Sequence, residues 1–167
     1  SQVLLLRHAN SKYNFAYNKM AEKEYSDEDY KKLRLRKDLR DAPLSDLGVQ
    51  ECVKAQPLAS KLKVEYVFVS PLKRAIETAY YVFNQHPNFE NIHFVLFPML
   101  KEALDTACDI PMNILDHVEE YKKKFPIFDT SLLDKYSDPA HFFLKDMNLD
   151  FAKEILSVKT PDAIDPM

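Results

Sequence analysis

The chain has 167 residues, a formal charge of −3 and 46% hydrophobic side chains, which excludes a disordered or fibrous protein and suits one globular domain. The balanced charge gives no reason to expect nucleic acid as a partner. No hydrophobic run approaches the roughly 18 to 20 residues that span a bilayer, so no membrane segment is expected. The unusual feature is a single glycine, since average usage of roughly 7% predicts about 12.

The chain contains two cysteines, Cys52 and Cys108. Two are too few for a disulfide framework or for a structural zinc site. We therefore expect both to be small buried hydrophobic side chains, and we expect the protein in a reducing compartment, the cytoplasm. No cofactor or metal is expected, and the sequence indicates no oligomeric state.

Three hydrophobic stretches predict strands, at residues 3–6, 64–69 and 92–97. They are rich in Val, Leu, Ile, Phe and Tyr and lack clean alternation along most of their length. This pattern is typical of strands buried on both faces, as in a parallel sheet covered by helices. The connections between them are long and read as helical, which predicts an α/β fold.

Helix signals fill these connections and the second half of the chain. One helix is predicted to start at Ser26 and to become basic between residues 31 and 40, where a solvated face is the favoured interpretation over a guard at a pocket entrance. A second helix is predicted to start at Ser45, with a kink at Pro57. A third is predicted to start at Ser70, with Pro71 in its first turn, and to run to about residue 83. Two more are predicted at residues 112–125 and about 139–156.

Chemically versatile residues follow the three predicted strands. In a parallel sheet, ligands bind outside the carboxyl ends of the strands. Arg7 and His8 follow the first strand, Arg74 comes shortly after the second, and Glu102 after the third. A neutral imidazole is a nucleophile, guanidinium groups grip phosphate oxygens, and a carboxylic acid can protonate a leaving oxygen. These residue types together predict phosphoryl transfer, which needs positioning and positive charge and does not in principle require a metal.

Four motifs in this order resemble the histidine phosphatase superfamily, also called phosphoglycerate-mutase-like. Residues 6–14 (LRHANSKYN) resemble its signature of Arg-His-Gly, then Ser or Thr, then Asn six residues after the His. Residues 43–48 (PLSDLG), 70–79 (SPLKRAIETA) and 100–102 (LKE) resemble its Pro-Leu-Thr/Ser-x-x-Gly, Ser-Pro-Leu-x-Arg-Ala-x-x-Thr-Ala and Leu-x-Glu. Each motif is weak alone, but their order across residues 6 to 102 makes the resemblance specific.

The resemblance implies a role for each of five residues. His8 would be the nucleophile that forms a phosphohistidine, and Glu102 would be the general acid and then the general base. Arg7, Asn14 and Arg74 would bind the phosphoryl group. Asp105 and Asp109 are nearby competitors for the acid role. The implied fold is a three-layer α/β/α sandwich with a mostly parallel central sheet.

The sequence departs from the family pattern at two points. Ala9 replaces the glycine after the histidine, which the backbone tolerates if its φ there is negative. The family also carries a second pocket histidine after a late strand, and none of His86, His93, His117 and His141 has that context. We expect a single domain over residues 1–167, with helical insertions or a lid at 15–40 and 105–156, that lacks the family's C-terminal strand and second catalytic histidine. Either the sequence is incomplete, which we favour, or the protein closes its sheet in another way.

The sequence therefore predicts a metal-independent histidine phosphatase that hydrolyses a phosphate monoester, carried by a small molecule or by a phosphoprotein. A phosphoglycerate-mutase-type phosphotransferase is the less favoured alternative, because we identify no contacts that would retain and reorient the phosphorylated intermediate. A catalytically impaired relative that binds a phosphorylated ligand or a protein is the other alternative.

Overall fold

The computed structural model describes residues 3–100, 102, 105–110 and 114–133, with only the backbone given for residues 114–118. A three-stranded sheet of order β1-β2-β3 contains β1 (Tyr66–Val69), β2 (His93–Leu96) and β3 (Phe128–Asp129). Both strand pairs are parallel, with Val67 opposite Phe94 and Phe94 opposite Phe128. The second and third predicted strands, and their parallel arrangement, are thereby confirmed.

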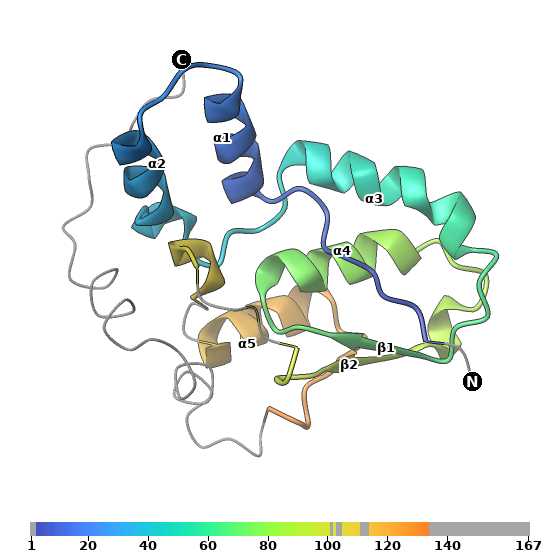
Figure 1. Ribbon diagram of the computed structural model, residues 1–167. Coiled ribbons are helices and arrows are strands. Elements are labelled where there is room, and N and C mark those ends of the chain that lie inside the picture. Colours follow the sequence, from blue (N-terminus) through green and yellow to red (C-terminus); the bar gives the residue numbers. More distant parts are fainter. Residues whose placement is uncertain (1–2, 101, 103–104, 111–113, 134–167) are drawn as a thin grey trace.

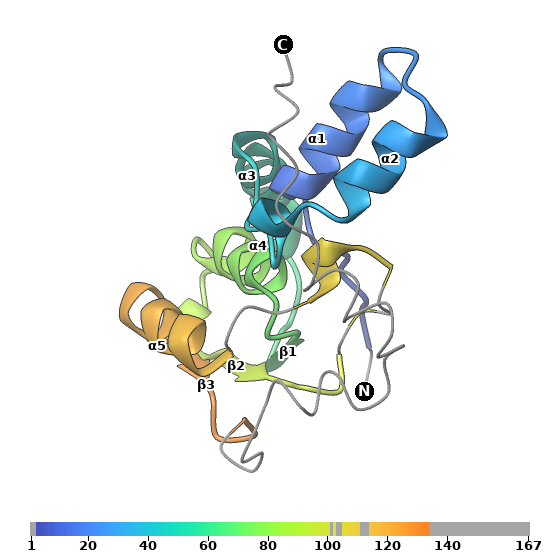
Figure 2. The same ribbon diagram turned by 90° about the vertical axis from the view of Figure 1, so that its left-hand side faces the viewer.

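Helices connect the strands and cover one face of the sheet (Figure 1). The helices are α1 (Lys12–Ala21), α2 (Asp27–Arg34), α3 (Asp46–Ala59), α4 (Lys73–Phe83) and α5 (Ile114–Lys124), with 3-10 turns η1 (Lys37–Leu39), η2 (Phe89–Asn91) and η3 (Ala107–Asp109). Helix α4 packs between the sheet and α3, and Figure 2 shows the α1–α2 pair standing apart from the sheet. The α/β class follows directly from this arrangement.

The main core lies between the sheet and α4. Phe94 and Leu96 of β2 point into it with Ile76 of α4, and all three are almost fully buried. On the opposite face of the sheet Tyr66 and Phe68 are each 56% exposed. The alternation along β1 therefore marks a strand with one buried and one exposed face among the described residues.

The sequence located most of the helix boundaries. Ser26 caps α2 by accepting from the Asp29 N–H, and Ser45 caps α3 by accepting from the Gly48 N–H. The first of these helices ends at Arg34, before the turn η1, and Pro57 lies in the last turn of α3. Helix α5 lies inside the predicted range 112–125, and the helix predicted at about 139–156 falls outside the described residues.

The predicted cap at Ser70 is wrong. Helix α4 begins at Lys73. Its N-cap residue is Leu72, whose side chain cannot accept a hydrogen bond from a helix N–H. Instead Asp41, which is fully buried with a φ of 46°, accepts from the Lys73 N–H at 3.0 Å. A carboxylate at a helix N-terminus also complements the helix dipole, so a distant residue replaces the local cap.

The predicted strand at residues 3–6 is also wrong. These residues form no strand, and their side chains are 57 to 97% exposed. A run of hydrophobic residues indicates that a segment can be buried. To form a strand, the segment also needs an adjacent strand that completes its backbone hydrogen bonds. Within the described part of the chain β1 pairs only with β2, so no strand is formed beside its other edge.

Helix α1 lies largely within the helical insertion expected at residues 15–40, but its start was not predicted, because its sequence lacks an amphipathic pattern. Its start is fixed by a capping box in which the Ser11 Oγ accepts from the Asn14 N–H and the Asn14 Oδ1 accepts from the Ser11 N–H, both at 3.1 Å. In the described residues no helix is long and apolar enough to cross a membrane. Cys52 and Cys108 are buried free thiols as expected, and burial raises the pKa of each to about 11.

Candidate active site

The carboxyl ends of β1 and β2 lie at the same edge of the sheet, because the two strands are parallel. Residues 70–74, which include Arg74, and residues 97–100, which precede Glu102, leave the sheet at this edge. The expected shared edge therefore exists for two of the three predicted segments. His8 reaches the same neighbourhood by another route.

The loop after His8 is fastened to the start of α3. The Asn10 carbonyl oxygen accepts from the Ser45 N–H at 3.0 Å and from the Ser45 Oγ at 3.1 Å. The Lys12 N–H donates to the Pro43 carbonyl oxygen at 2.9 Å. A Cβ on Gly48 would lie 2.0 Å from the Asn10 carbonyl oxygen, which no real contact allows. The glycine is therefore needed so that two of the motifs can touch.

Thr78 of α4 joins the histidine loop to the arginine. Its Oγ1 accepts from the Ala9 N–H at 3.0 Å and donates to the Arg74 carbonyl oxygen at 2.7 Å. Ala9 does not have a positive φ, since Asp41 is the only such non-glycine residue in the described ranges. The alanine therefore fits where the family has glycine. Thr78 stands in a recognised motif, but the sequence alone gave it no role.

His8 is half-buried and held in one tautomer. Its Nδ1 lies 2.8 Å from the Ala9 carbonyl oxygen. A carbonyl oxygen can only accept, so Nδ1 carries the proton and the lone pair of the neutral ring is on Nε2. Burial lowers the pKa of His8, the Ala9 bond opposes this, and the charges of Arg74 and Arg7 lower the pKa while that of Glu102 raises it. The ring is thus kept neutral and nucleophilic near pH 7.

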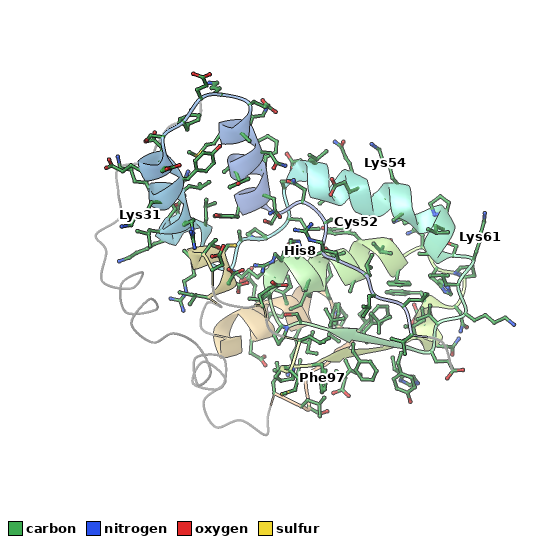
Figure 3. All side chains as sticks on the ribbon, in the orientation of Figure 1. His8, Lys31, Cys52, Lys54, Lys61 and Phe97 are labelled. Carbon is green, nitrogen blue, oxygen red and sulfur yellow. The ribbon has the colours of Figure 1, made fainter. Side chains whose placement is uncertain are left out.

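A pocket of about 240 Å³ opens beside His8. Figure 3 shows His8 near the N-terminal part of α4. The lining is polar apart from one alanine and consists of Arg7, His8, Ala9, Asn10, Asn14, Asn18 and Glu51. Three of the five predicted site residues, Arg7, His8 and Asn14, therefore lie together in its wall.

Glu51 and Asn18 also line the pocket, and neither of them was predicted from the sequence to be a site residue. The Glu51 Oε2 accepts from the Asn10 N–H at 2.8 Å, so a carboxylate from α3 stands at the pocket. Asn18 lies one helical turn after Asn14 on α1, which puts both amides on the same helix face. The helical spacing would have linked these asparagines if α1 had been predicted.

Arg74 does not line this pocket and is only 3% exposed. Its Nη1 donates to the Cys108 carbonyl oxygen at 2.7 Å, and its Nη2 donates to the Asp109 Oδ1 at 3.0 Å. A guanidinium has five N–H groups, and these two bonds use two of them. Arg74 is thus a fixed, buried cation, close enough to His8 for its charge to lower the His8 pKa.

Glu102 is exposed at the same edge and lies outside the pocket lining. Its charge raises the His8 pKa, so the two side chains share an electrostatic neighbourhood. The competing carboxylates are occupied by arginines: Asp105 pairs with Arg34, and Asp109 pairs with Arg74. The proton-donor role of Glu102 stays a prediction.

The other histidines described lie apart from His8. His86 is buried, with its Nε2 3.1 Å from the Leu62 carbonyl oxygen, and His93 stacks on Tyr66 with 4.9 Å between ring centroids. His141 and the side chain of His117 fall outside the described residues.

The basic run at residues 31–40 is largely paired. Lys32 bonds to Glu28 at 3.3 Å, Arg34 pairs with Asp105, and Arg36 pairs with Asp38. A paired and solvated face fits these contacts better than a guard at the pocket entrance.

Comparison with known proteins identifies the family of this chain. Residues 3–104 match the model of the histidine phosphatase superfamily, branch 1. A curated protein of Schizosaccharomyces pombe, described as a "probable phosphatase", is 31% identical over 91 residues. That match covers 53% of this chain and 40% of the relative, so the chain spans less than half of the relative's length. The matched residues contain His8, Arg74 and Glu102, and the chain belongs to the histidine phosphatase superfamily, with its α/β fold.

Proposed function

We propose that this protein is a phosphatase that hydrolyses phosphate monoesters through a phosphohistidine on His8. The observation that carries the proposal is the state of His8: a half-buried ring with its lone pair on Nε2, at a polar pocket and near two arginines. The proposed substrate is a phosphate monoester, carried by a small molecule or by a phosphoprotein.

In the first proposed step, Nε2 of His8 attacks the phosphorus atom and forms a P–N bond. The P–O bond to the alcohol breaks, and the leaving oxygen takes a proton from the carboxyl group of Glu102. Arg7 and Asn14, which line the pocket, and Arg74, which is fixed outside its lining, would hold the phosphoryl oxygens and offset their charge.

In the second proposed step, the Glu102 carboxylate takes a proton from water as the water oxygen attacks the phosphorus. The P–N bond breaks, inorganic phosphate leaves, and both His8 and Glu102 return to their starting protonation states. No metal takes part in these steps, since the cations are the arginines.

Two alternatives predict different behaviour. A mutase would return the phosphoryl group to the same substrate, which needs contacts that retain the intermediate. Arg7 is the one permanent cation among the described residues that line the pocket, so the lining offers no further cation for that purpose. A binding module would hold a phosphorylated ligand without turnover.

The test is hydrolysis of a generic aryl phosphate, followed by rapid quenching and a search for acid-labile phosphate on His8. We expect turnover and label on the wild-type chain, and loss of both in His8→Gln by roughly a thousandfold or more. His93→Gln is the matched control, because that ring is exposed on β2 and stacks on Tyr66. Turnover that survives His8→Gln would refute the mechanism, and phosphate binding without turnover would favour the binding module.

A further inference from the structure

An acidic side chain lies directly against the arginine that would grip the phosphoryl group. The Asp109 Oδ1 accepts from the Arg74 Nη2 at 3.0 Å, and the side chains are 10% and 3% exposed. A carboxylate here reduces the positive charge available to a phosphate, so its presence needs a physical reason.

The Asp109 carboxylate is fixed by its own turn. Its Oδ2 accepts from the Thr106 N–H at 2.9 Å and from the Asp105 N–H at 3.1 Å. The Thr106 Oγ1 lies 3.3 Å from the same oxygen and caps η3. Both carboxylate oxygens thus have partners, and the group cannot rotate without breaking several hydrogen bonds.

Arg74 is held at two points by this turn. Its Nη2 meets Asp109, and its Nη1 meets the carbonyl oxygen of Cys108, the preceding residue. A free arginine side chain loses rotamer entropy when it binds a ligand, and a side chain that is already fixed does not. A guanidinium held along one edge keeps its remaining N–H groups in a constant orientation.

We infer that Asp109 is a positioning residue that orients Arg74 for the phosphoryl group. This inference rests on the proposed function. Asp105, at the other end of the same turn, provides the contrast, because it pairs with Arg34 at the surface with 72% of its side chain exposed.

The test compares Asp109→Asn with the matched control Asp105→Asn. An amide has one oxygen in place of the two of the carboxylate, and its nitrogen cannot accept a hydrogen bond. The asparagine side chain therefore cannot accept hydrogen bonds from the backbone of the turn and from Arg74 at the same time. As a result, the turn no longer fixes the orientation of the Arg74 guanidinium. We expect inorganic phosphate, measured by calorimetry, to bind about tenfold more weakly to Asp109→Asn. We expect less than about a twofold change in Asp105→Asn.

Two further measurements separate orientation from charge and from folding. Asp109→Asn is compared in the Arg74→Ala background, where a residue that acts through Arg74 has no further effect on phosphate affinity. Binding is repeated at high salt, where an effect on the general field is screened and an effect on a buried orientation persists. If Asp109→Asn unfolds, Thr106→Val loosens the same carboxylate and should weaken phosphate binding in the same direction.

The outcomes are distinct. Tighter or unchanged phosphate binding in Asp109→Asn overturns the inference, as does an undiminished effect in the Arg74→Ala background. If the wild-type chain binds phosphate without hydrolysing esters, the proposed function fails and the inference is judged on affinity alone. If the wild-type chain binds no phosphate, both fail.

Discussion

The two sides of the candidate site are held by different kinds of interaction. On the histidine side, backbone groups of Ala9, Asn10 and Lys12 meet Thr78, Ser45 and Pro43, and a glycine lets the backbones touch. On the acid side, residues 105–110 are joined to the rest by arginine side chains: Arg34 pairs with Asp105 at the surface, and the buried Arg74 bonds to Asp109 and to the Cys108 carbonyl oxygen.

The difference indicates which side can move. Contacts between backbone groups of different motifs depend little on the side chains present. By contrast, the Arg34–Asp105 pair, which lies three residues after Glu102, is exposed, and an exposed ion pair is weak and exchanges readily with solvent. We infer that the nucleophile is held rigidly and that the acid is the more adjustable partner. The predictions below test this contrast from its strongest contact to its weakest.

Gly48→Ala should give the largest effect. The new Cβ would lie 2.0 Å from the Asn10 carbonyl oxygen, a backbone atom that cannot turn away. We expect the free energy of unfolding to fall by about 3 kcal/mol, measured by urea denaturation. Gln50→Ala, at an exposed position two residues later, is the control and should change stability by less than about 0.5 kcal/mol. An unchanged free energy of unfolding in Gly48→Ala would show that the contact between Gly48 and the Asn10 carbonyl oxygen can open to admit a side chain.

Glu77→Ala should come next, because it removes a buried acceptor beneath the same side. The Glu77 Oε2 accepts from the Leu44 N–H at 2.7 Å, and its Oε1 accepts from the Tyr121 hydroxyl at 3.0 Å. We expect a loss of about 2 kcal/mol in the free energy of unfolding, since a buried N–H loses its acceptor. Glu90→Ala, at an exposed site in η2, is the control.

The rate should depend on pH through His8. Burial lowers the pKa of His8 below the usual value of about 6.5, and the nearby arginines act in the same direction. The neutral nucleophile therefore persists to more acidic pH, and kcat/KM should fall by about tenfold per pH unit only below the lowered pKa. Arg7→Ala removes one positive charge and should move this limb to higher pH. If the pH at which kcat/KM begins to fall is the same in Arg7→Ala and in the wild-type chain, the charge of Arg7 does not lower the His8 pKa.

Arg34→Ala should have the smallest effect. The Arg34–Asp105 pair is largely exposed, with 45% and 72% of the two side chains accessible. We expect less than about 1 kcal/mol of lost stability, which vanishes at high salt. Arg36→Ala, which breaks the Arg36–Asp38 pair, is the control. A loss as large as that in Glu77→Ala would show that the acid side is fastened as firmly as the histidine side.

The sequence predicted the elements whose signals are local. Ser26 and Ser45 stand next to the N–H groups that they cap, and the hydrophobic runs of β1 and β2 are continuous. Predictions failed where a partner comes from a distant segment. Asp41 caps α4 from 32 residues away, and residues 3–6 have the composition of a strand without a described neighbour.

The site follows the same rule. His8, Arg7 and Asn14 lie in one short motif, and the structure places all three in one pocket. The roles of Thr78, Glu51 and Asp109 depend on contacts with residues 35 to 69 positions away in sequence. No spacing rule could reveal them before the segments were brought together.

The bond between the His8 ring and the Ala9 carbonyl also determines the regiochemistry of the proposed intermediate. Because Nδ1 is occupied as a donor, the phosphoryl group can attach only to Nε2, which gives the tele isomer of phosphohistidine. The pros isomer would require that this hydrogen bond break and the ring turn over. An isomer-specific antibody or a phosphorus–nitrogen NMR coupling can therefore read out, from a single modified residue, whether this backbone contact holds during turnover.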